Sequence, residues 1–298
     1  MSVVPSCSSN EKMDTLSHKN KKAAMVHVVK SSDTDTGRKF IAAVDEALVS
    51  KDSSQPSNRV VFDCEGVDLS RLGSVELISI CFSSMEVFLV DFGKNLDRDI
   101  LKAVKDLLED ANIIKIIHDC RMDSDALFHL HGIDIQNVHD TACFHEEITG
   151  RVDVNLNSVL SYNGIEQNQI RDKNVYKNNY EFWATRPLTK MMINWASADV
   201  DRLFDVADKQ LDRISRSGKS CAITKSNKNI RHTREMSVES GLSVRNPGLF
   251  IGRRGSNLHS LQRITGTLIY ACGRGRKNWM VYYANVKDLE SVKRSMRS

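Results

Sequence analysis

The alternation of apolar and polar residues predicts a series of strands and helices between about residues 24 and 213. Residues 25–30 are apolar enough for a first strand, and residues 39–49 place apolar side chains every three or four positions, as one face of a helix does. Three more strands are predicted in close succession, at 60–65, 76–82 and 87–92. A helix at about 97–108, a buried strand at 113–117 and helix-period segments from 122 to 211 follow. This order predicts a mixed α/β sheet flanked by helices.

Outside that region the pattern changes twice. The first 23 residues are rich in Ser, Asn and Lys and lack a periodic apolar pattern, so residues 1–23 are predicted to be a disordered tail. Ser, Lys, Asn and Gly again replace apolar residues after about residue 213, which predicts a linker over residues 214–234. The expected organisation is therefore a large domain at 24–213 and a smaller α+β domain at 235–298.

Composition is typical of a globular intracellular protein with about two domains. The chain has 298 residues, of which 41% are apolar. No apolar segment approaches the ~18 residues that span a bilayer, and the N-terminus lacks the pattern of a secretion signal. Seven scattered cysteines, none in a Cys-x-x-Cys pair, indicate reduced thiols rather than disulfides or a zinc site. We expect no membrane association and a location in the cytoplasm or the nucleus.

Charge is unevenly divided along the chain. Residues 1–208 contain 23 Lys and Arg against 33 Asp and Glu, whereas residues 209–298 contain 19 against 5. A basic C-terminal third on an acidic body is what a polyanion-binding module joined to a metal-dependent domain would have, although a basic face is more often simply solvated. Charge alone does not identify the partner.

Two carboxylates one residue apart, Asp63 and Glu65, lie at the end of the strand predicted at 60–65. Side chains at i and i+2 of a strand point to the same face, so both carboxylates are directed to one place. A divalent cation would suit such a pair. An acidic pair at a strand end is, however, more often solvated turn chemistry, and the motif by itself does not decide between the two.

Two further acidic clusters follow, one in the stretch 118–127 and one in the stretch 195–203. The three clusters in this order resemble the DEDD superfamily of 3′-to-5′ exonucleases, in particular its ribonuclease D-like branch. The resemblance covers about residues 24–213 and is sharpest at 63–68, at 118–127 and at 186–200. It implies a ribonuclease H-like sheet, hydrolysis of phosphodiester bonds, and two Mg²⁺ or Mn²⁺ ions. The ligands it implies are Asp63, Glu65, Asp123 and Asp199.

The third cluster departs from that family pattern. Ribonuclease D-like enzymes have Tyr four residues before the last Asp, and a sister branch has His five residues before it, to position the attacking water. Trp195 and Asn194 stand at those positions here. Because indole is only a hydrogen-bond donor, Trp195 cannot hold a water as a phenol or imidazole does. Trp195 falls on a mainly apolar stripe of its predicted helix, so it is expected to pack beside the site. Such a substitution leaves metal binding intact and puts the catalytic rate in doubt.

Neighbouring polar residues have alternative interpretations. Asp125 lies two positions beyond Asp123 and is the other candidate ligand, although the family pattern places Asp123 at the site. His118 is expected to close its strand by hydrogen bonding, and Asp140 is expected to cap a helix. Three more residues are treated as accessories without an assigned role: Asp68, Asp119 and Arg121.

Near the C-terminus, Gly252 and Gly255 flank Arg253 and Arg254, and apolar residues then recur every three positions before Thr-Gly at 265–266. This frame resembles the signature of the KH domain and covers about residues 235–298. Strands at 267–272 and 278–284 and a closing helix from residue 286 agree with it. The resemblance implies binding of single-stranded nucleic acid, for which the glycines allow close backbone approach and the arginines pair with phosphates. The alternative is a glycine-rich turn that caps a core helix.

Two functions are consistent with these patterns. The first is a metal-dependent 3′-5′ exonuclease acting on single-stranded RNA, with DNA as the other candidate, held by a C-terminal KH domain. The second is a nuclease fold that has become an RNA-binding adaptor with little turnover. The four acidic residues favour the enzyme, because converging carboxylates are costly without a bound cation. The missing Tyr or His favours the adaptor.

Overall fold

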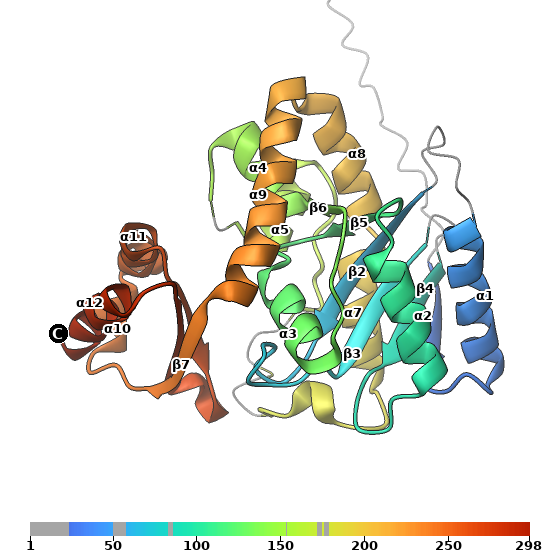
Figure 1. Ribbon diagram of the computed structural model, residues 1–298, viewed down its shortest axis with the longest axis horizontal. Coiled ribbons are helices and arrows are strands. Elements are labelled where there is room, and N and C mark those ends of the chain that lie inside the picture. Colours follow the sequence, from blue (N-terminus) through green and yellow to red (C-terminus); the bar gives the residue numbers. More distant parts are fainter. Residues whose placement is uncertain (1–23, 50–57, 83–85, 153, 172–174, 176–178) are drawn as a thin grey trace, which may run out of the picture.

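A six-stranded mixed sheet forms the centre of the N-terminal part of the protein (Figure 1). The computed structural model describes residues 24–49, 58–82, 86–152, 154–171, 175 and 179–298. The sheet order is β1-β4-β3-β2-β5-β6, in which β3 is antiparallel to β2 and to β4 and the other neighbours are parallel. The strands are β1 (Met25–Val29), β2 (Arg59–Glu65), β3 (Leu77–Cys81), β4 (Glu86–Asp91), β5 (Ile114–Ile117) and β6 (Val138–Asp140).

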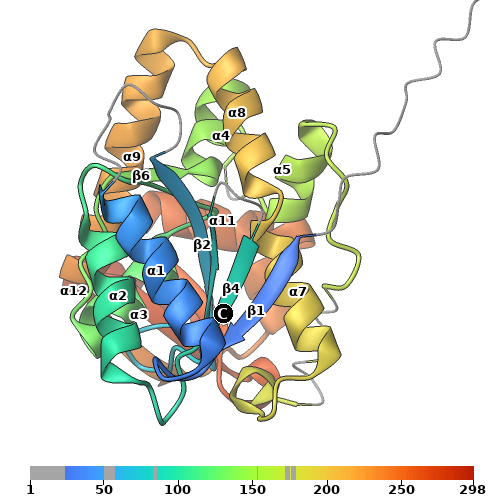
Figure 2. The same cartoon turned by 90° about the vertical axis from the view of Figure 1, so that its right-hand side faces the viewer.

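Helices cover both faces of this sheet (Figure 2). The first face packs against α1 (Asp35–Val49), α2 (Arg98–Glu109) and α3 (Arg121–His131). The second packs against α5 (Leu156–Tyr162), α7 (Lys190–Val200) and α8 (Leu203–Arg213), with α4 (Thr141–Thr149) following β6. Along β2, Phe62 and Cys64 belong to the first core and Val61 to the second. The two-residue period of the strand therefore directs Asp63 and Glu65 to the face that α7 covers.

The predicted α/β fold is confirmed, with a mixed sheet between two layers of helices. Each strand and helix predicted between residues 25 and 117 is present, with ends shifted by a few residues. The short strand β6 was not predicted, because its three residues are too few to show a period. The predicted tail at 1–23 lies outside the described residues. Among the described residues, no helix combines the length and the apolar content needed to cross a membrane.

The prediction of a linker at 214–234 is wrong, because α9 (Arg216–Glu235) is a continuous helix of 20 residues. It begins at Ser215, whose side chain accepts the Gly218 N–H at 3.1 Å. Its buried residues are Ala222, Ser226, Ile230 and Thr233, and Ile230 joins the core beneath the first face of the sheet. Ser226 and Thr233 satisfy their hydroxyls by donating to carbonyls one turn earlier. A helix can thus bury a face that is poor in large apolar residues.

After α9 the chain forms a smaller unit with its own three-stranded antiparallel sheet, in the order β7-β9-β8. Its elements are β7 (Ser237–Leu242), α10 (Pro247–Ile251), α11 (Ser256–Thr265), β8 (Leu268–Cys272), β9 (Asn278–Tyr283) and α12 (Val286–Arg297). Phe250, Trp279, Val281 and Val292 belong to the apolar core between this sheet and its helices. The two strands and the closing helix expected from the sequence are present. Assignment of this unit to the KH class remains a prediction.

The open face of the small sheet lies against the N-terminal part of the protein. Asp125 on α3 is fully buried and accepts hydrogen bonds from the Arg71 guanidinium (2.7 and 2.9 Å) and from the Tyr282 hydroxyl of β9 (2.7 Å). Asp68 accepts the Gly273 N–H (2.8 Å), and Met122 packs against the apolar cluster that includes Tyr282. These buried contacts hold the two units in one arrangement.

Candidate active site

Three carboxylates meet where β2 ends beneath α7. Asp63 and Glu65 come from β2, and Asp199 comes from the last turn of α7. One oxygen from each of them lies within 4.8 Å of the others. Glu65 and Asp199 are buried, at 9% and 2% exposure, and Asp63 is half-buried. The prediction that these residues from distant parts of the chain converge is therefore met for three of the four.

The loop before α7 is anchored so that Asp199 is directed at the strand pair. Arg186 donates to Asp91 at the end of β4 (2.7 Å), to the Trp183 carbonyl (2.6 Å) and to the Glu76 carbonyl (2.7 Å). Thr189 then caps α7 by accepting the Met192 N–H at 3.2 Å. An arginine that joins one loop to two neighbouring strands fixes where the helix begins, and the position of Asp199 follows from the helix period.

Asp123 lies beside the other three carboxylates but has a different hydrogen-bond partner. Its Oδ1 accepts the backbone N–H of Cys64, between the two acidic residues of β2, at 2.9 Å. β5 pairs with β2 only as far as Val61, so beyond Val61 this edge of β2 has no neighbouring strand. The Asp123 carboxylate accepts the backbone hydrogen bond there instead. Its carboxylate is close enough for its charge to raise the pKa of Asp63 and of Glu65.

The electrostatics of the cluster favour a bound cation. Burial raises the pKa of Asp63 well above its ordinary value, and the charges of Asp123 and Asp199 raise it further. Burial likewise raises the pKa of Glu65, with repulsion from Asp63 next in size, and raises the pKa of Asp123 to about 7. Glu65 Oε1 is buried without a hydrogen-bond partner among the described residues. An all-oxygen, negatively charged and partly unsatisfied set of this kind fits Mg²⁺ or Mn²⁺.

Two residues without any recognisable sequence signal also belong to the site. The Arg171 Nε lies 3.2 Å from Asp199 Oδ2, and its charge lowers the pKa of Asp63, Glu65 and Asp199 against the larger effect of burial. Asn168 donates to Asp199 Oδ1 at 2.9 Å. Both belong to the segment between α5 and α7, about 30 positions before Asp199. Only the folded chain brings them to the carboxylates.

Trp195 is a core residue, as its helical stripe predicts. It is 2% exposed, and its ring lies edge-on to Trp183 with centroids 5.7 Å apart. Asn194, at the other family position, is exposed. Among the described residues, the carboxylate set thus has neither a tyrosine nor a histidine at the positions where the family provides one.

The remaining predicted residues have structural partners. His118 lies 3.0 Å from the Thr141 hydroxyl and 3.0 Å from the Val154 carbonyl, and Asp140 caps α4 by accepting the Ala142 N–H at 2.9 Å. Both expectations are confirmed. Asp125, the alternative ligand, belongs to the contact with the C-terminal unit and is absent from the carboxylate group. Asp119 pairs with Arg121.

In the C-terminal unit, the segment 252–255 forms the exposed connection between α10 and α11. Gly252 (φ 73°, ψ 174°) and Gly255 (φ 81°) both have positive φ angles. A Cβ on Gly252 would lie 2.6 Å from the Asn257 side chain, and one on Gly255 would lie 2.9 Å from the His259 ring. Arg253 and Arg254 are exposed between them. Both glycines are therefore required by the backbone path.

Comparison with known proteins identifies the family of the larger unit. Residues 42–214, more than half of the chain, match the family described as 3′-5′ exonuclease. The chain belongs to the 3′-5′ exonuclease family. The match contains all four predicted acidic residues and ends near the close of α8, before the C-terminal unit begins.

Individual relatives agree with this assignment. The piRNA biogenesis protein EXD1 of Mus musculus is 29% identical over an alignment of 164 positions that covers 50% of this chain and 28% of EXD1. Ribonuclease D of Bartonella henselae is 27% identical over an alignment of 143 positions that covers 47% of this chain and 33% of that protein. The chain thus spans about a third or less of the length of these relatives. The structure of Trypanosoma brucei RNase D in complex with RNA U12 has the same fold, with a TM-score of 0.55, 22% identity and 71% coverage of each chain.

Proposed function

We propose that this protein is a metal-dependent 3′-5′ exonuclease that hydrolyses single-stranded nucleic acid, with RNA as the preferred substrate. The observation that carries the proposal is the set of two buried carboxylates and one half-buried carboxylate, Glu65, Asp199 and Asp63, with oxygens within 4.8 Å of one another. Buried like charges of this kind destabilise a protein unless a cation compensates them. The family membership and the complex of an RNase D with RNA support the reaction and the substrate class.

The residues have separate roles in this proposal. Asp63, Glu65, Asp123 and Asp199 would together hold two Mg²⁺ or Mn²⁺ ions. Such ions activate a water and stabilise charge on the phosphate when they are bound. Asn168 keeps Asp199 oriented through its 2.9 Å hydrogen bond. Arg171, next to Asp199, is placed to attract the phosphate of a strand that enters the site.

In the same proposal the unit at 235–298 is a KH domain that holds the strand, and the catalytic domain occupies 24–213. Support comes from the two positive-φ glycines at 252 and 255, which let a sugar-phosphate backbone approach closely, and from Arg253 and Arg254 between them. The following helix α11 has no side-chain cap at its N-terminus, so its first N–H groups face the loop.

A second candidate is an RNA-binding adaptor with little or no hydrolysis. The burial of Trp195 among other aromatic side chains favours it, because that side chain cannot position a water. The retained acidic cluster favours the enzyme, since a protein that only binds RNA, a polyanion, gains nothing from a buried negative centre. We therefore place the exonuclease first.

One cleavage assay separates the two candidates. The full chain is incubated with 5′-labelled single-stranded RNA or DNA in Mg²⁺, Mn²⁺ or EDTA, alongside Asp199→Asn and Asp212→Asn variants. Asp212 is exposed on α8, so its variant makes the same chemical change away from the site. The exonuclease gives a ladder that shortens from the 3′ end in wild type and Asp212→Asn, and a rate lower by roughly 100-fold or more in Asp199→Asn. Intact RNA that is nevertheless retarded on a native gel would identify the adaptor.

A further inference from the structure

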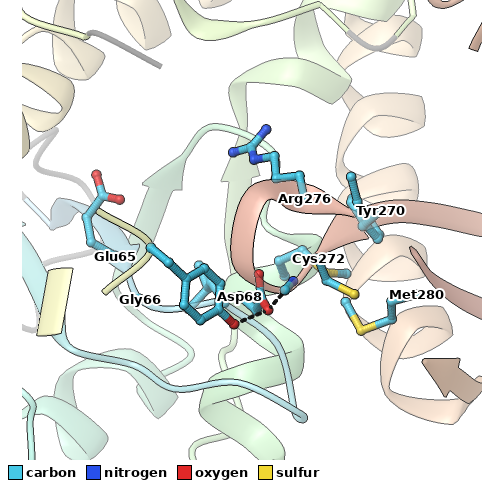
Figure 3. Close-up of a pocket in the computed structure, with 12 residues that line it drawn as sticks. Glu65, Gly66, Asp68, Tyr270, Cys272, Arg276 and Met280 are labelled. Atoms are coloured by element: carbon cyan, nitrogen blue, oxygen red, sulfur yellow. Dashed lines mark hydrogen bonds between the residues drawn. The ribbon is translucent and has the colours of Figure 1, made fainter. Parts of the chain in front are cut away.

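A pocket of about 230 Å³ lies between the end of β2 and the turn that joins β8 to β9 (Figure 3). The catalytic domain lines it with Glu65 and Met122, and the C-terminal unit lines it with Tyr270, Met280 and Arg276. Glu65 also belongs to the carboxylate cluster, so the pocket and the candidate metal centre share this residue. A wall of the site beside that centre is therefore built by the second unit.

The position of this wall is determined by half-buried hydrogen bonds. Asp68 accepts the Gly273 N–H at 2.8 Å, just before the turn that carries Arg276, and also accepts the Tyr180 hydroxyl at 2.5 Å (Figure 3). The Arg276 N–H in turn donates to the Gly273 carbonyl at 2.9 Å. The turn is thus attached to the residues that follow Glu65, and its distance from the carboxylates does not depend on a flexible tether.

The lining of the pocket combines charged, apolar and aromatic groups. Glu65 comes from the end of β2, and the exposed guanidinium of Arg276 extends from the turn of the C-terminal unit (Figure 3). The thioethers of Met122 and Met280 and the ring of Tyr270 also line the pocket. A nucleotide has the matching distribution, because its phosphate pairs with cations while its base and sugar pack against apolar and aromatic side chains.

We propose that this pocket is a nucleotide subsite shared by the two units, in which Arg276 binds a phosphate of the single strand whose end lies at the carboxylates. The inference rests on the proposed function, because it takes the strand to be the ligand of the metal centre. The excess of basic residues at 209–298, 19 against 5 acidic, favours a polyanion over a neutral ligand. The C-terminal unit then contributes directly to the active site, in addition to holding the strand at 252–255.

Binding measurements on the full chain test this subsite without requiring hydrolysis. The probe is a 5′-fluorescein single-stranded RNA of 12 nucleotides with 4-thiouridine at its 3′ end, titrated in EDTA and followed by anisotropy. Arg276→Glu is compared with Arg274→Glu, a charge reversal in the same turn at an exposed residue that does not line the pocket. Arg276→Lys keeps the charge. Matched melting temperatures show that all three variants are folded.

We expect Arg276→Glu to weaken binding about tenfold, and Arg274→Glu and Arg276→Lys to change it less than about threefold. Irradiation should cross-link the 3′-terminal base to peptides that contain Met122 or residues 270–280. Equal losses in the two Glu variants, or no loss in either, would overturn the proposal, as would cross-links confined to residues 247–265.

The outcome is separable from that of the nuclease proposal. If Arg276→Glu alone loses affinity but the wild-type chain never shortens RNA in Mg²⁺ or Mn²⁺, the subsite is upheld and the hydrolytic function fails. If the wild-type chain trims RNA from the 3′ end while both Glu variants bind equally, the hydrolytic function is upheld and the subsite fails.

Discussion

Asp125 is predicted to be the residue on which the contact between the two units most depends. Its carboxylate is 0% exposed and accepts three hydrogen bonds from Arg71, one from the backbone and two from the guanidinium, as well as one from Tyr282. Arg71 also donates to the carbonyls of Thr233 and Met236 at 2.7 and 3.0 Å. One buried carboxylate therefore joins α3, the end of α9 and β9.

Asp125→Ala leaves the Arg71 guanidinium, whose side chain is only 15% exposed, without its counter-charge, which costs about 3 kcal/mol. Tyr282→Phe removes a single hydrogen bond to a charged group and costs about 1.5–3 kcal/mol. For a chain of this size, Asp125→Ala should lower the melting temperature by roughly 10 °C. The double variant should lose little more than Asp125→Ala alone, because both changes remove the same hydrogen bond.

Thermal unfolding followed by circular dichroism measures these differences, with Asp208→Ala as the control. Asp208 pairs with Arg59 but is 52% exposed, so its loss should cost less than about 1 kcal/mol. An Asp125→Ala protein that melts within about 2 °C of the wild type, or no lower than Asp208→Ala, would refute the assignment of Asp125 to the contact between the units.

Three further predictions concern other parts of the molecule. Mg²⁺ or Mn²⁺ at about 100 times its dissociation constant should raise the free energy of unfolding by about 2.7 kcal/mol. This should appear as a rise in melting temperature that Asp199→Asn abolishes. An equal rise in the variant would argue against the site. Burial lowers the pKa of His139 to about 4, so below about pH 6.5 the unfolded chain binds a proton at this residue that the folded chain does not. The free energy of unfolding, measured by urea titration, should therefore fall by about 3 kcal/mol from pH 6.5 to pH 4. His139→Gln should remove this contribution to the pH dependence. Gly252→Ala should destabilise the C-terminal unit by about 1–3 kcal/mol and weaken RNA binding. Gly266→Ala, where an added Cβ meets nothing within 4 Å, should lower the melting temperature less. Equal losses of stability in the two variants would contradict this explanation.

Local patterns were sufficient for five of the six strands of the large sheet and for half of the carboxylate site. The alternation along β2 is a property of a few adjacent residues, and it correctly places Asp63 and Glu65 on one face and Cys64 in the opposite core. The position of Asp199 beside Asp63 and Glu65 could be predicted only from the order of acidic clusters in a known family, because no local pattern connects α7 with β2. The hydrogen bond from Cys64 to Asp123 depends on where β5 ends, which the sequence does not reveal.

The features that were missed depend on long-range packing. The buried face of α9 consists mainly of Ala, Ser and Thr, so its sequence resembles a polar connection, and its helical state is supported by the surfaces of α3, α4 and β6 against which it packs. Arg71 and Asp125 are distant in sequence and acquire a partner in Tyr282 only when the C-terminal sheet is in place. Charged residues of this kind cannot be distinguished from solvated ones before the fold is known.

The proposed function requires the carboxylates of β2 and α7 to hold divalent ions while the strand is hydrolysed. Electron paramagnetic resonance of Mn²⁺ counts bound ions while single-turnover cleavage of 5′-labelled RNA is followed in the same samples. We expect cleavage from the 3′ end to rise with the occupancy of the ions, and Asp199→Asn to lose both ion binding and cleavage. Cleavage that persists in EDTA, or manganese binding that is unchanged in Asp199→Asn, would contradict it.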